Sequence, residues 1–345
     1  MTSAAGGRRL FLDTIAGKAT ARRPVWIMRQ AGRYLPEYRA LRARHSFEEL
    51  SGSAELSADV TLQPLARFPL DAAIIFADLM SPVAALGLDV TFAPGPVLAH
   101  PVRTAADVDA LRTPSRDEIA PSVMGALRTV KGALSGRQAL LGFAGAPWSL
   151  AAYVVQGRGN PGFPALRAMA FADPGLLHAL MTRLSDLVID YVHAQVAAGA
   201  DAVQFFDTWA GVLSVDTWTR LVRPHLARII DATSGLGVPR ILFLQDASHL
   251  VPHYAQLPSE ALAVDWREDL GALRASIGPK KALQGNLDPA ILLAGPAATR
   301  AATTELLARV AARGHIVNLG HGITPEAPID SVHALIETVH AEGQP

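Results

Sequence analysis

Three arginines lie close together near the N-terminus, in the stretch MRQAGRYLPEYR at residues 28–39. A guanidinium group stays charged and binds a carboxylate through two parallel hydrogen bonds. Arg29 and Arg33 are four residues apart, so one helical turn would place them on the same side. Such a cluster suits a ligand with several carboxylates. Arginines at this spacing also form ordinary surface salt bridges, and the pattern alone leaves both interpretations open.

Asp78 lies in the stretch IIFADLM, where apolar residues flank it on both sides. A carboxylate in such surroundings is costly unless it has partners. It could point inward and accept hydrogen bonds from ligand N–H groups, or bind a cation. It could equally cap the N-terminus of a helix, a position where Asp is favoured.

His321 stands between two glycines in the stretch NLGHG, and glycine permits a close approach of the backbone. An isolated histidine is more often simply a hydrogen-bonded residue. Tyr153 lies on a predicted helix that follows a turn of small residues within 142–162. The end of that stretch matches G-x-G-x-x-G, but Pro161 and Pro164 disturb a following helix and no strand directly precedes it. We therefore do not expect a dinucleotide site.

Metal and thiol chemistry have little support in the sequence. The chain has no cysteine, which excludes disulfides, thiolate zinc sites, iron–sulfur clusters and cysteine nucleophiles. His249 and His253 are four residues apart, but Pro252 lies between them and no Glu follows His249. A zinc-binding helix is therefore not expected, and we predict no metal and no cofactor.

Eight short apolar runs recur along the chain and are continuously hydrophobic rather than alternating. They are PVWIM (24–28), DAAIIF (71–76), ALLGF (139–143), AVQFF (202–206), RILFL (240–244), ALAVD (261–265), KALQ (281–284) and HIVNL (315–319). Strands that are buried on both faces of a parallel sheet have this composition. Helical patterns lie between them, at 54–68, 176–198, 215–231, 289–313 and 328–340.

Eight strands that alternate with helices predict an α/β fold, a (β/α)8 barrel of the TIM type. The alternative is an open doubly wound sheet, and the gap between the runs at 240 and 261 is short for a full helix. The segment 87–102 has a Pro-Gly centre between two short extended runs. This pattern predicts a hairpin excursion after the second strand.

Polar residues follow the apolar runs closely, at the strand ends where barrel active sites lie. They are Arg29, Gln30, Asp78, Asp207, Thr208, Gln245, Asp246, Trp266, Arg267, Asn286, Asp288 and His321. If the barrel forms, these residues converge on one mouth. Any one of them could instead be an ordinary loop residue.

The composition excludes several classes of protein. With 345 residues, of which 50% are hydrophobic and 18% charged, the chain can form a core and is not disordered. Lys plus Arg and Asp plus Glu both total 31, so no overall field points to nucleic acid or to an anionic membrane surface. No apolar run reaches the length of a membrane helix, and no secretory signal is evident. We expect a soluble, cytoplasmic protein.

Taken together, several of these stretches resemble the uroporphyrinogen decarboxylase family. PVWIMRQAGRYLPEYR (24–39) is similar to the family's N-terminal signature, and GFAGAPWSLAAYVVQG (142–157) to its second signature. The remaining blocks follow in order, as DAAIIFADLM (71–80), QFFDTWAG (204–211), LQGNLDP (283–289) and NLGHGITPE (318–326). The resemblance covers nearly the whole chain.

The resemblance implies a single (β/α)8 domain over residues 1–345, usually as a homodimer. It also implies a reaction without a cofactor, in haem and tetrapyrrole biosynthesis. The four acetate side chains of uroporphyrinogen III become methyl groups, which gives coproporphyrinogen III and CO2. The implied partner is thus a small-molecule tetrapyrrole, with neither nucleic acid nor membrane.

The resemblance also implies roles for individual residues. A substrate-binding loop comprises Arg29, Gln30, Ala31, Gly32 and Arg33, while Asp78, Tyr153, Thr208 and His321 also contact the substrate. Thr208 stands where many members carry Ser, and the stretch GRGNPGFPAL (157–166) departs from the family pattern, so we assign no contact to it. Asp78 would bind the pyrrole N–H groups and stabilise a cationic ring. Arg29, a water held by it, or His321 would deliver the proton.

Two alternatives come from other classes. A related group of barrels transfers methyl groups between corrinoids and thiols, using zinc held by His and Cys, and the absence of cysteine argues against it. A non-catalytic tetrapyrrole-binding protein would explain the arginines but gives no special reason for Asp78.

Overall fold

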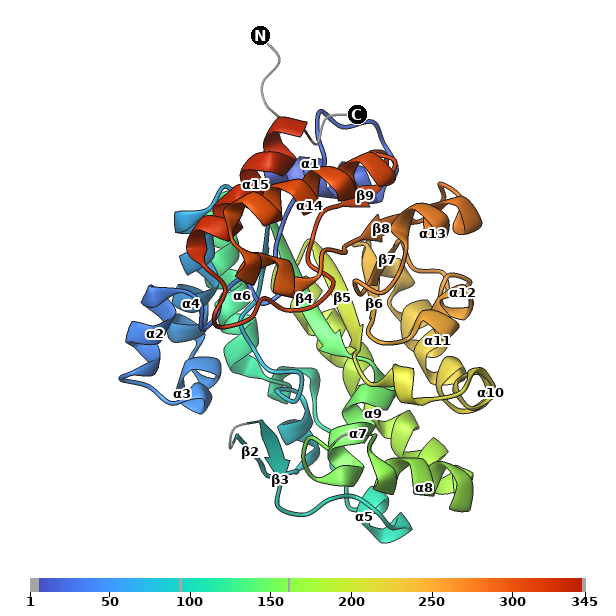
Figure 1. Cartoon of the computed structure of the whole chain (residues 1–345). Helices are drawn as coiled ribbons and strands as arrows, with labels where there is room; N and C mark the ends of the chain where they lie inside the picture. The colour runs from blue at the N-terminus through green and yellow to red at the C-terminus, as the bar shows by residue number, and fades with distance from the viewer. Residues whose placement is uncertain (1–5, 93–94, 161, 343–345) are drawn as a thin grey trace.

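A curled parallel sheet runs through the molecule, and helices pack around it (Figure 1). The computed structural model describes residues 6–92, 95–160 and 162–342. Its seven-stranded sheet has the order β1-β4-β5-β6-β7-β8-β9, with every neighbouring pair parallel. The strands are β1 (Ala72–Ile74), β4 (Ala139–Gly145), β5 (Ala202–Asp207), β6 (Arg240–Leu244), β7 (Ala261–Val264), β8 (Ala282–Gln284) and β9 (His315–Ile316).

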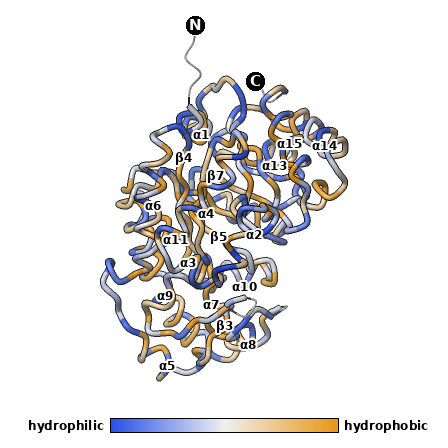
Figure 2. The backbone as a smooth tube through the Cα atoms, turned by 90° about the vertical axis from the view of Figure 1, so that its left-hand side faces the viewer, coloured by the Kyte–Doolittle hydropathy of each residue, from blue (hydrophilic) through white to orange (hydrophobic). Residues whose placement is uncertain are grey.

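The strands form where the apolar runs are continuous, because both of their faces are covered. Every residue of β4 and of β6 is buried, and the central strands are predominantly hydrophobic in Figure 2. The interior is not wholly apolar. Gln284 on β8 donates from Nε2 to Oε1 of Gln204 on β5 at 3.0 Å, and accepts from Trp26 Nε1 at 3.0 Å. Since β5 and β8 are not neighbours in the sheet, this contact shows how strongly the sheet curls.

The run at 24–28 was predicted as a strand, and here the prediction is wrong in detail. The segment makes only one isolated parallel bridge, from Val25 to Val317 beyond β9. On its other side Val25 O accepts from Asp71 N at 2.9 Å, just before β1. Side chains replace the partners of a sheet ladder, because Val25 N donates to the Asp71 carboxylate, and Ile27 N and Met28 N donate to side-chain oxygens of Gln30 and Asn318.

The helices follow the predicted pattern closely. They are α1 (Gly7–Ile15), α2 (Pro36–Arg42), α3 (Phe47–Gly52), α4 (Ala54–Arg67), α5 (Ala105–Asp109), α6 (Pro121–Leu134), α7 (Pro147–Gln156), α8 (Pro164–Ala172), α9 (Pro174–Ala197), α10 (Val215–Thr217), α11 (Arg223–Ala232), α12 (Val251–Tyr254), α13 (Leu270–Ile277), α14 (Pro296–Arg309) and α15 (Ile329–Glu342). The predicted helix at 215–231 is divided by a π-helical turn at Trp218–Val222. Pro224 has no N–H to continue an α-helical hydrogen-bond pattern there.

A small antiparallel pair lies between β1 and β4, where the sequence predicts a hairpin. β2 (Val90–Phe92) pairs with β3 (Pro96–Leu98), while the centre of the segment, residues 93–94, lies outside the described residues. β3 lies against the end of α7, because Leu98 N donates to Gly157 O at 2.7 Å. Across the ranges that the structure describes, no helix is both long and apolar enough to cross a membrane.

Candidate active site

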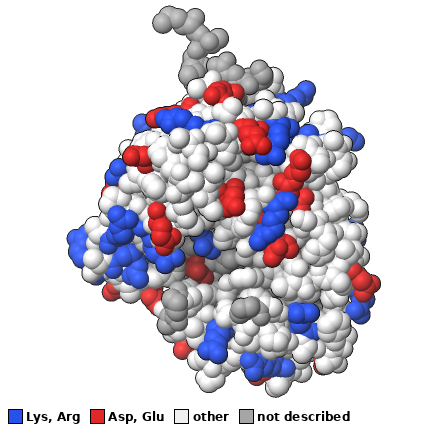
Figure 3. Space-filling model, viewed as in Figure 1, with Lys and Arg blue, Asp and Glu red and all other residues white. Residues whose placement is uncertain are grey.

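The side chains singled out from the sequence come from different elements and meet at the carboxyl ends of the strands. Arg29 follows the 24–28 segment, Asp78 follows β1, Thr208 follows β5 and His321 follows β9, while Tyr153 lies on α7. Figure 3 shows a hollow near the centre of the visible face, with basic and acidic side chains inside it. The charges of Arg29 and Asp78 each shift the pKa of the other, which places the two groups near each other.

Arg29 has an unusual backbone and a confined side chain. Its φ is 62°, a left-handed conformation that non-glycine residues rarely adopt. The side chain is open to solvent, yet enough protein surrounds it that burial lowers its pKa, as expected for a group inside a hollow. The side chain lies directly over Gly322, because a Cβ at that glycine would be 2.3 Å from Arg29 Cδ.

In the rest of the 29–33 loop, Gln30 is buried and holds the backbone in place, whereas Arg33 is exposed. Gln30 is fully buried, and its side chain accepts from Ile27 N and donates to Ala72 O, both at 3.0 Å. It therefore supports the loop from below. Ala31 is buried, Gly32 is half-buried, and Arg33 is exposed. The helical turn considered for Arg29 and Arg33 does not form, because residues 28–35 are turns and bends and α2 begins only at Pro36.

Of the two carboxylate oxygens of Asp78, the fold uses one and leaves the other without a described donor. Its Oδ1 accepts from Met80 N at 2.8 Å, so it caps a turn rather than a helix. No described residue donates to its Oδ2. Desolvation raises the pKa of Asp78, while the Met80 N–H and the Arg29 charge lower it. A desolvated carboxylate with one free oxygen is suited to accepting hydrogen bonds from a ligand.

Tyr153 stands in an aromatic cluster at one side of the hollow. Its ring centroid is 6.0 Å from that of Phe163 and 6.2 Å from that of Trp209, and the latter two rings are 4.8 Å apart. Burial raises the pKa of Tyr153, so its hydroxyl stays protonated at neutral pH. Phe163 is fully buried and supports the half-buried rings of Tyr153 and Trp209, which offer flat apolar surface to an aromatic ligand.

Thr208 is held by a buried network that sequence reasoning did not identify. The carboxylate of its neighbour Asp207 is fully buried and accepts from Ser149 Oγ at 2.8 Å and from the Tyr254 hydroxyl. Ser149 Oγ in turn accepts from Trp209 N at 3.1 Å. Burial raises the pKa of Asp207 to about 6. The network fixes the turn after β5, and with it the positions of Thr208 and Trp209.

His321 is a neutral imidazole in this environment. Burial, and to a lesser extent the charge of Arg29, lower its pKa to about 4. Its ring centroid is 6.2 Å from that of Phe243 at the end of β6. At neutral pH the ring can therefore accept or donate a hydrogen bond but carries no charge.

What unites these residues is hydrogen-bonding capacity that the fold leaves unused. Among the described residues, the Arg29 and Arg33 guanidinium groups, the Thr208 hydroxyl and the His321 ring find no side-chain hydrogen bond or ion pair. By contrast, Arg22 binds Asp71 through two hydrogen bonds of 2.7 Å. Polar groups that are gathered in one hollow without partners indicate a polar, anionic ligand.

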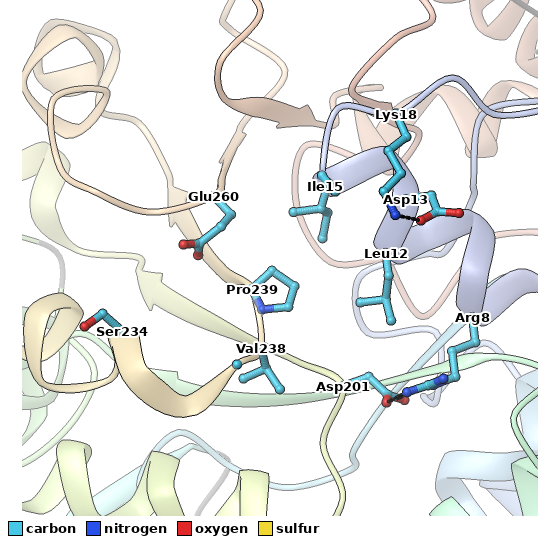
Figure 4. A pocket seen from close by; sticks show the side chains of 12 residues that line it. Arg8, Leu12, Asp13, Ile15, Lys18, Asp201, Ser234, Val238, Pro239 and Glu260 are labelled. Atoms are coloured by element: carbon cyan, nitrogen blue, oxygen red, sulfur yellow. Dashed lines mark hydrogen bonds and ion pairs between the residues drawn. The ribbon is translucent and has the colours of Figure 1, made fainter.

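A second cavity, at the opposite ends of the strands, differs in this respect. It has a volume of ≈ 460 Å³ and lies between α1 and the residues that precede β5, β6 and β7 (Figure 4). Its charges are already paired, Lys18 with Asp13 at 2.7 Å and Arg8 with Asp201 at 2.9 Å. It therefore offers an anionic ligand little. Within the described ranges, no group of three or more His, Cys, Asp or Glu side chains has the arrangement of a metal site.

Comparison with known proteins decides the family. The family model described as uroporphyrinogen decarboxylase (URO-D) matches residues 7–342. The chain belongs to the uroporphyrinogen decarboxylase family. Among curated relatives, the uroporphyrinogen decarboxylase of Trichlorobacter lovleyi is 42% identical over 335 residues, which cover 97% of this chain and 98% of the relative. That of Hahella chejuensis is 43% identical over 343 residues, covering 97% and 96%.

Solved structures share the fold at much lower identity. A methyltransferase from Methanosarcina mazei superposes with a TM-score of 0.83 at 19% identity, over 97% of this chain and 98% of that one. A B12-independent methionine synthase from Shewanella sp. W3-18-1 reaches a TM-score of 0.56 at 12% identity, over 94% and 95%. The uroporphyrinogen decarboxylase family thus shares its architecture with methyl-transferring proteins.

Proposed function

We propose that this protein decarboxylates the four acetate side chains of uroporphyrinogen III, giving coproporphyrinogen III and CO2 without a cofactor. Family membership over nearly the whole chain supports the reaction. The single structural observation that carries the proposal is that the Arg29 guanidinium, which has no ion pair with a described residue, lies near the desolvated Asp78 carboxylate. Arginines suit the carboxylates at the rim of this substrate, and a carboxylate suits the N–H groups at its centre.

We further propose that residues 1–345 form one closed (β/α)8 barrel domain with the β2–β3 hairpin as an excursion after the second barrel strand. The 24–28 segment supports closure, because it hydrogen-bonds to Val317 on one side and to Asp71 on the other. The Gln204–Gln284 contact supports it too, since it spans the inside of the sheet. We extend the proposal to a cytoplasmic homodimer, as the family resemblance implies.

In the proposed complex, Asp78 accepts hydrogen bonds from the pyrrole N–H groups through its free oxygen. Arg29 and Arg33 bind substrate carboxylates, and the backbone of Gln30, Ala31 and Gly32 shapes the loop between them. Tyr153, Thr208 and His321 contact the substrate from the surrounding elements. Holding the substrate at several points orients the reacting acetate arm, and such orientation lowers the barrier of the chemical step.

The chemistry requires an electron sink for each arm. A proton added to a pyrrole ring carbon makes the ring cationic, the C–C bond to the carboxylate breaks, and its electron pair flows into the ring as CO2 leaves. The resulting methylene group takes up a proton and the ring carbon loses one, which restores the pyrrole. Asp78 faces the cation and stabilises it electrostatically. The proton comes from Arg29, whose pKa burial lowers, or from a water that Arg29 holds. His321 is neutral and is the weaker proton source.

The test is an anaerobic incubation of purified, metal-stripped protein with uroporphyrinogen III in the presence of a chelator. We expect the products to lose one carboxyl group at a time, from eight to four, with one CO2 released at each step. A non-catalytic binding protein would bind the substrate and return it with all eight carboxyl groups. A zinc-dependent methyl transferase would show no activity until zinc, a corrinoid and a thiol were supplied.

Arg33→Ala is expected to weaken substrate use while leaving the fold intact, because Arg33 is exposed and has no ion pair with a described residue. Loss of one charge-assisted hydrogen-bonded contact, ~1.5–3 kcal/mol, corresponds to an increase in KM of about 10-fold or more. Steady-state kinetics measure it. Arg44→Ala removes another exposed arginine, beyond α2, and should leave KM unchanged. Equal KM values for the wild type and Arg33→Ala would make Arg33 an ordinary surface residue.

A further inference from the structure

We propose that Arg267 binds a further carboxylate of the substrate, on the other side of His321 from Arg29, and that Asp246 occupies this position until substrate displaces it. The inference rests on the proposed function, because it assigns a specificity-determining residue to that same site. Neither residue was among those that the family resemblance implied.

The placement of Arg267 follows from two glycine contacts. A Cβ at Gly320 would lie 2.3 Å from Trp266 N, so the backbone of the 320–322 turn touches the residue that precedes Arg267. On its other side the same turn touches the Arg29 side chain through Gly322. His321 therefore lies between the two arginines, and both of their charges lower its pKa.

The guanidinium group of Arg267 is anchored on one edge and one face. Its Nη1 donates to Asp265 Oδ2 at 2.9 Å, and its backbone N donates to Asp265 Oδ1 at 2.9 Å. Asp265 is buried, so this anchor is rigid. The guanidinium also stacks over the Trp266 ring, 4.3 Å from its centroid. These contacts fix the orientation of the guanidinium group, and its charge balances that of Asp265.

The remaining edge of Arg267 has only a weak partner. Its Nε is 3.5 Å from Asp246 Oδ1, which is within ion-pair range but longer than a good hydrogen bond. The Asp246 side chain is 71% exposed and that of Arg267 is 43% exposed. An ion pair between two such exposed side chains contributes little to stability. A carboxylate of a bound substrate can therefore replace Asp246.

Arg240 shows what an arginine with a purely structural role looks like in this protein. Arg240, at the start of β6, donates to Glu260, to Ile230 O at 2.6 Å and to Pro258 O at 3.0 Å. It is buried, and its partners are all part of the fold. By contrast, the Arg267 guanidinium makes one hydrogen bond with the fold, from Nη1 to Asp265, and its other N–H donors remain available at the mouth of the sheet.

The experiment compares Arg267→Gln and Asp246→Asn with the wild type by steady-state kinetics. We expect Arg267→Gln to raise KM for uroporphyrinogen III about 10-fold with little change in kcat. Asp246→Asn should lower KM several-fold, because it removes the competing carboxylate. Asn also tolerates the left-handed backbone at this position, where φ is 53°, so the variant should fold normally. Arg300→Gln, which removes an exposed ion pair with Glu337, is the matched control.

A second substrate identifies which carboxylate is bound. The pentacarboxylate intermediate keeps all four propionates but only one acetate. An equal increase in KM for both substrates would mean that Arg267 binds a propionate, and an increase confined to uroporphyrinogen would mean an acetate. Unchanged KM values in Arg267→Gln, or a higher KM in Asp246→Asn, would overturn the proposal. If the wild type itself releases no CO2, the proposed function fails, and the failure is distinct from that of Arg267.

Discussion

Asp78→Asn should fold normally and lose about 10³-fold in kcat, measured as CO2 release from uroporphyrinogen III under anaerobic conditions. The amide keeps an oxygen that can accept from Met80 N, so the turn after β1 is preserved. What it removes is the negative charge, held in a desolvated position, that would face the cationic ring. A fixed charge of this kind is worth far more in a low-dielectric site than in water.

The chain offers a closely matched control for this variant. Asp288, exposed after β8, also accepts from the backbone N two residues further on, Ala290, at 2.9 Å. Asp288→Asn makes the same chemical change at an exposed residue that caps the 3-10 helix Pro289–Ala294, and should leave kcat unchanged. Near-normal turnover by Asp78→Asn would exclude a central electrostatic role for that carboxylate.

Gly322→Ala is the second variant with a large expected effect. The three atoms nearest to an added Cβ all belong to the Arg29 side chain, at 2.3, 2.8 and 2.9 Å, whereas an ordinary carbon contact is about 3.5–4.0 Å. The side chain of Arg29 must therefore move away. Misplacing a catalytic group by about 1 Å can cost about 10²-fold, and we expect kcat/KM to fall by that factor.

Because the contact involves a single side chain, Gly322→Ala should change thermal stability little. Gly132→Ala provides the control. Gly132 lies on α6 with nothing within 4 Å of an added Cβ, so alanine there should raise the free energy of unfolding by about 0.5–1 kcal/mol and leave kinetics unchanged. If Gly322→Ala retained full kcat/KM, the observed position of Arg29 would be irrelevant to catalysis.

Much of the fold could be predicted because its signals are local. A continuous apolar run such as 240–244 needs only burial on both faces to become a strand, and it becomes β6. The run at 24–28 looks the same in the sequence, yet it makes only one bridge. Only Trp26 N donates to a neighbouring backbone, at Val317 O, while the N–H groups of Val25, Ile27 and Met28 donate to side chains of Asp71, Gln30 and Asn318, and no local pattern reveals these partners.

In the candidate site, too, residues with a local sequence signal could be predicted, and those that depend on distant partners could not. Arg29 and Asp78 stood out because charged residues follow apolar runs, and the structure brings them together. The network around Asp207 could not be inferred, since Ser149 and Tyr254 reach it from 58 and 47 residues away along the chain and no local pattern pairs them with it. The role of Gln30 was also hidden, because its side chain turns away from the loop to support the backbone.

The segment that carries Arg29 is built against the far end of the chain. Arg23 donates to Leu307 O and Val310 O, and Met28 N donates to Asn318 Oδ1, across separations of 284, 287 and 290 residues. During translation, the first arginine of the site is therefore synthesised early but positioned only after the residues around 307–322 have left the ribosome. Contacts of such long range form late, because closing so large a loop costs entropy. A nascent chain that stops short of this segment carries every strand up to β8 and still lacks a working site.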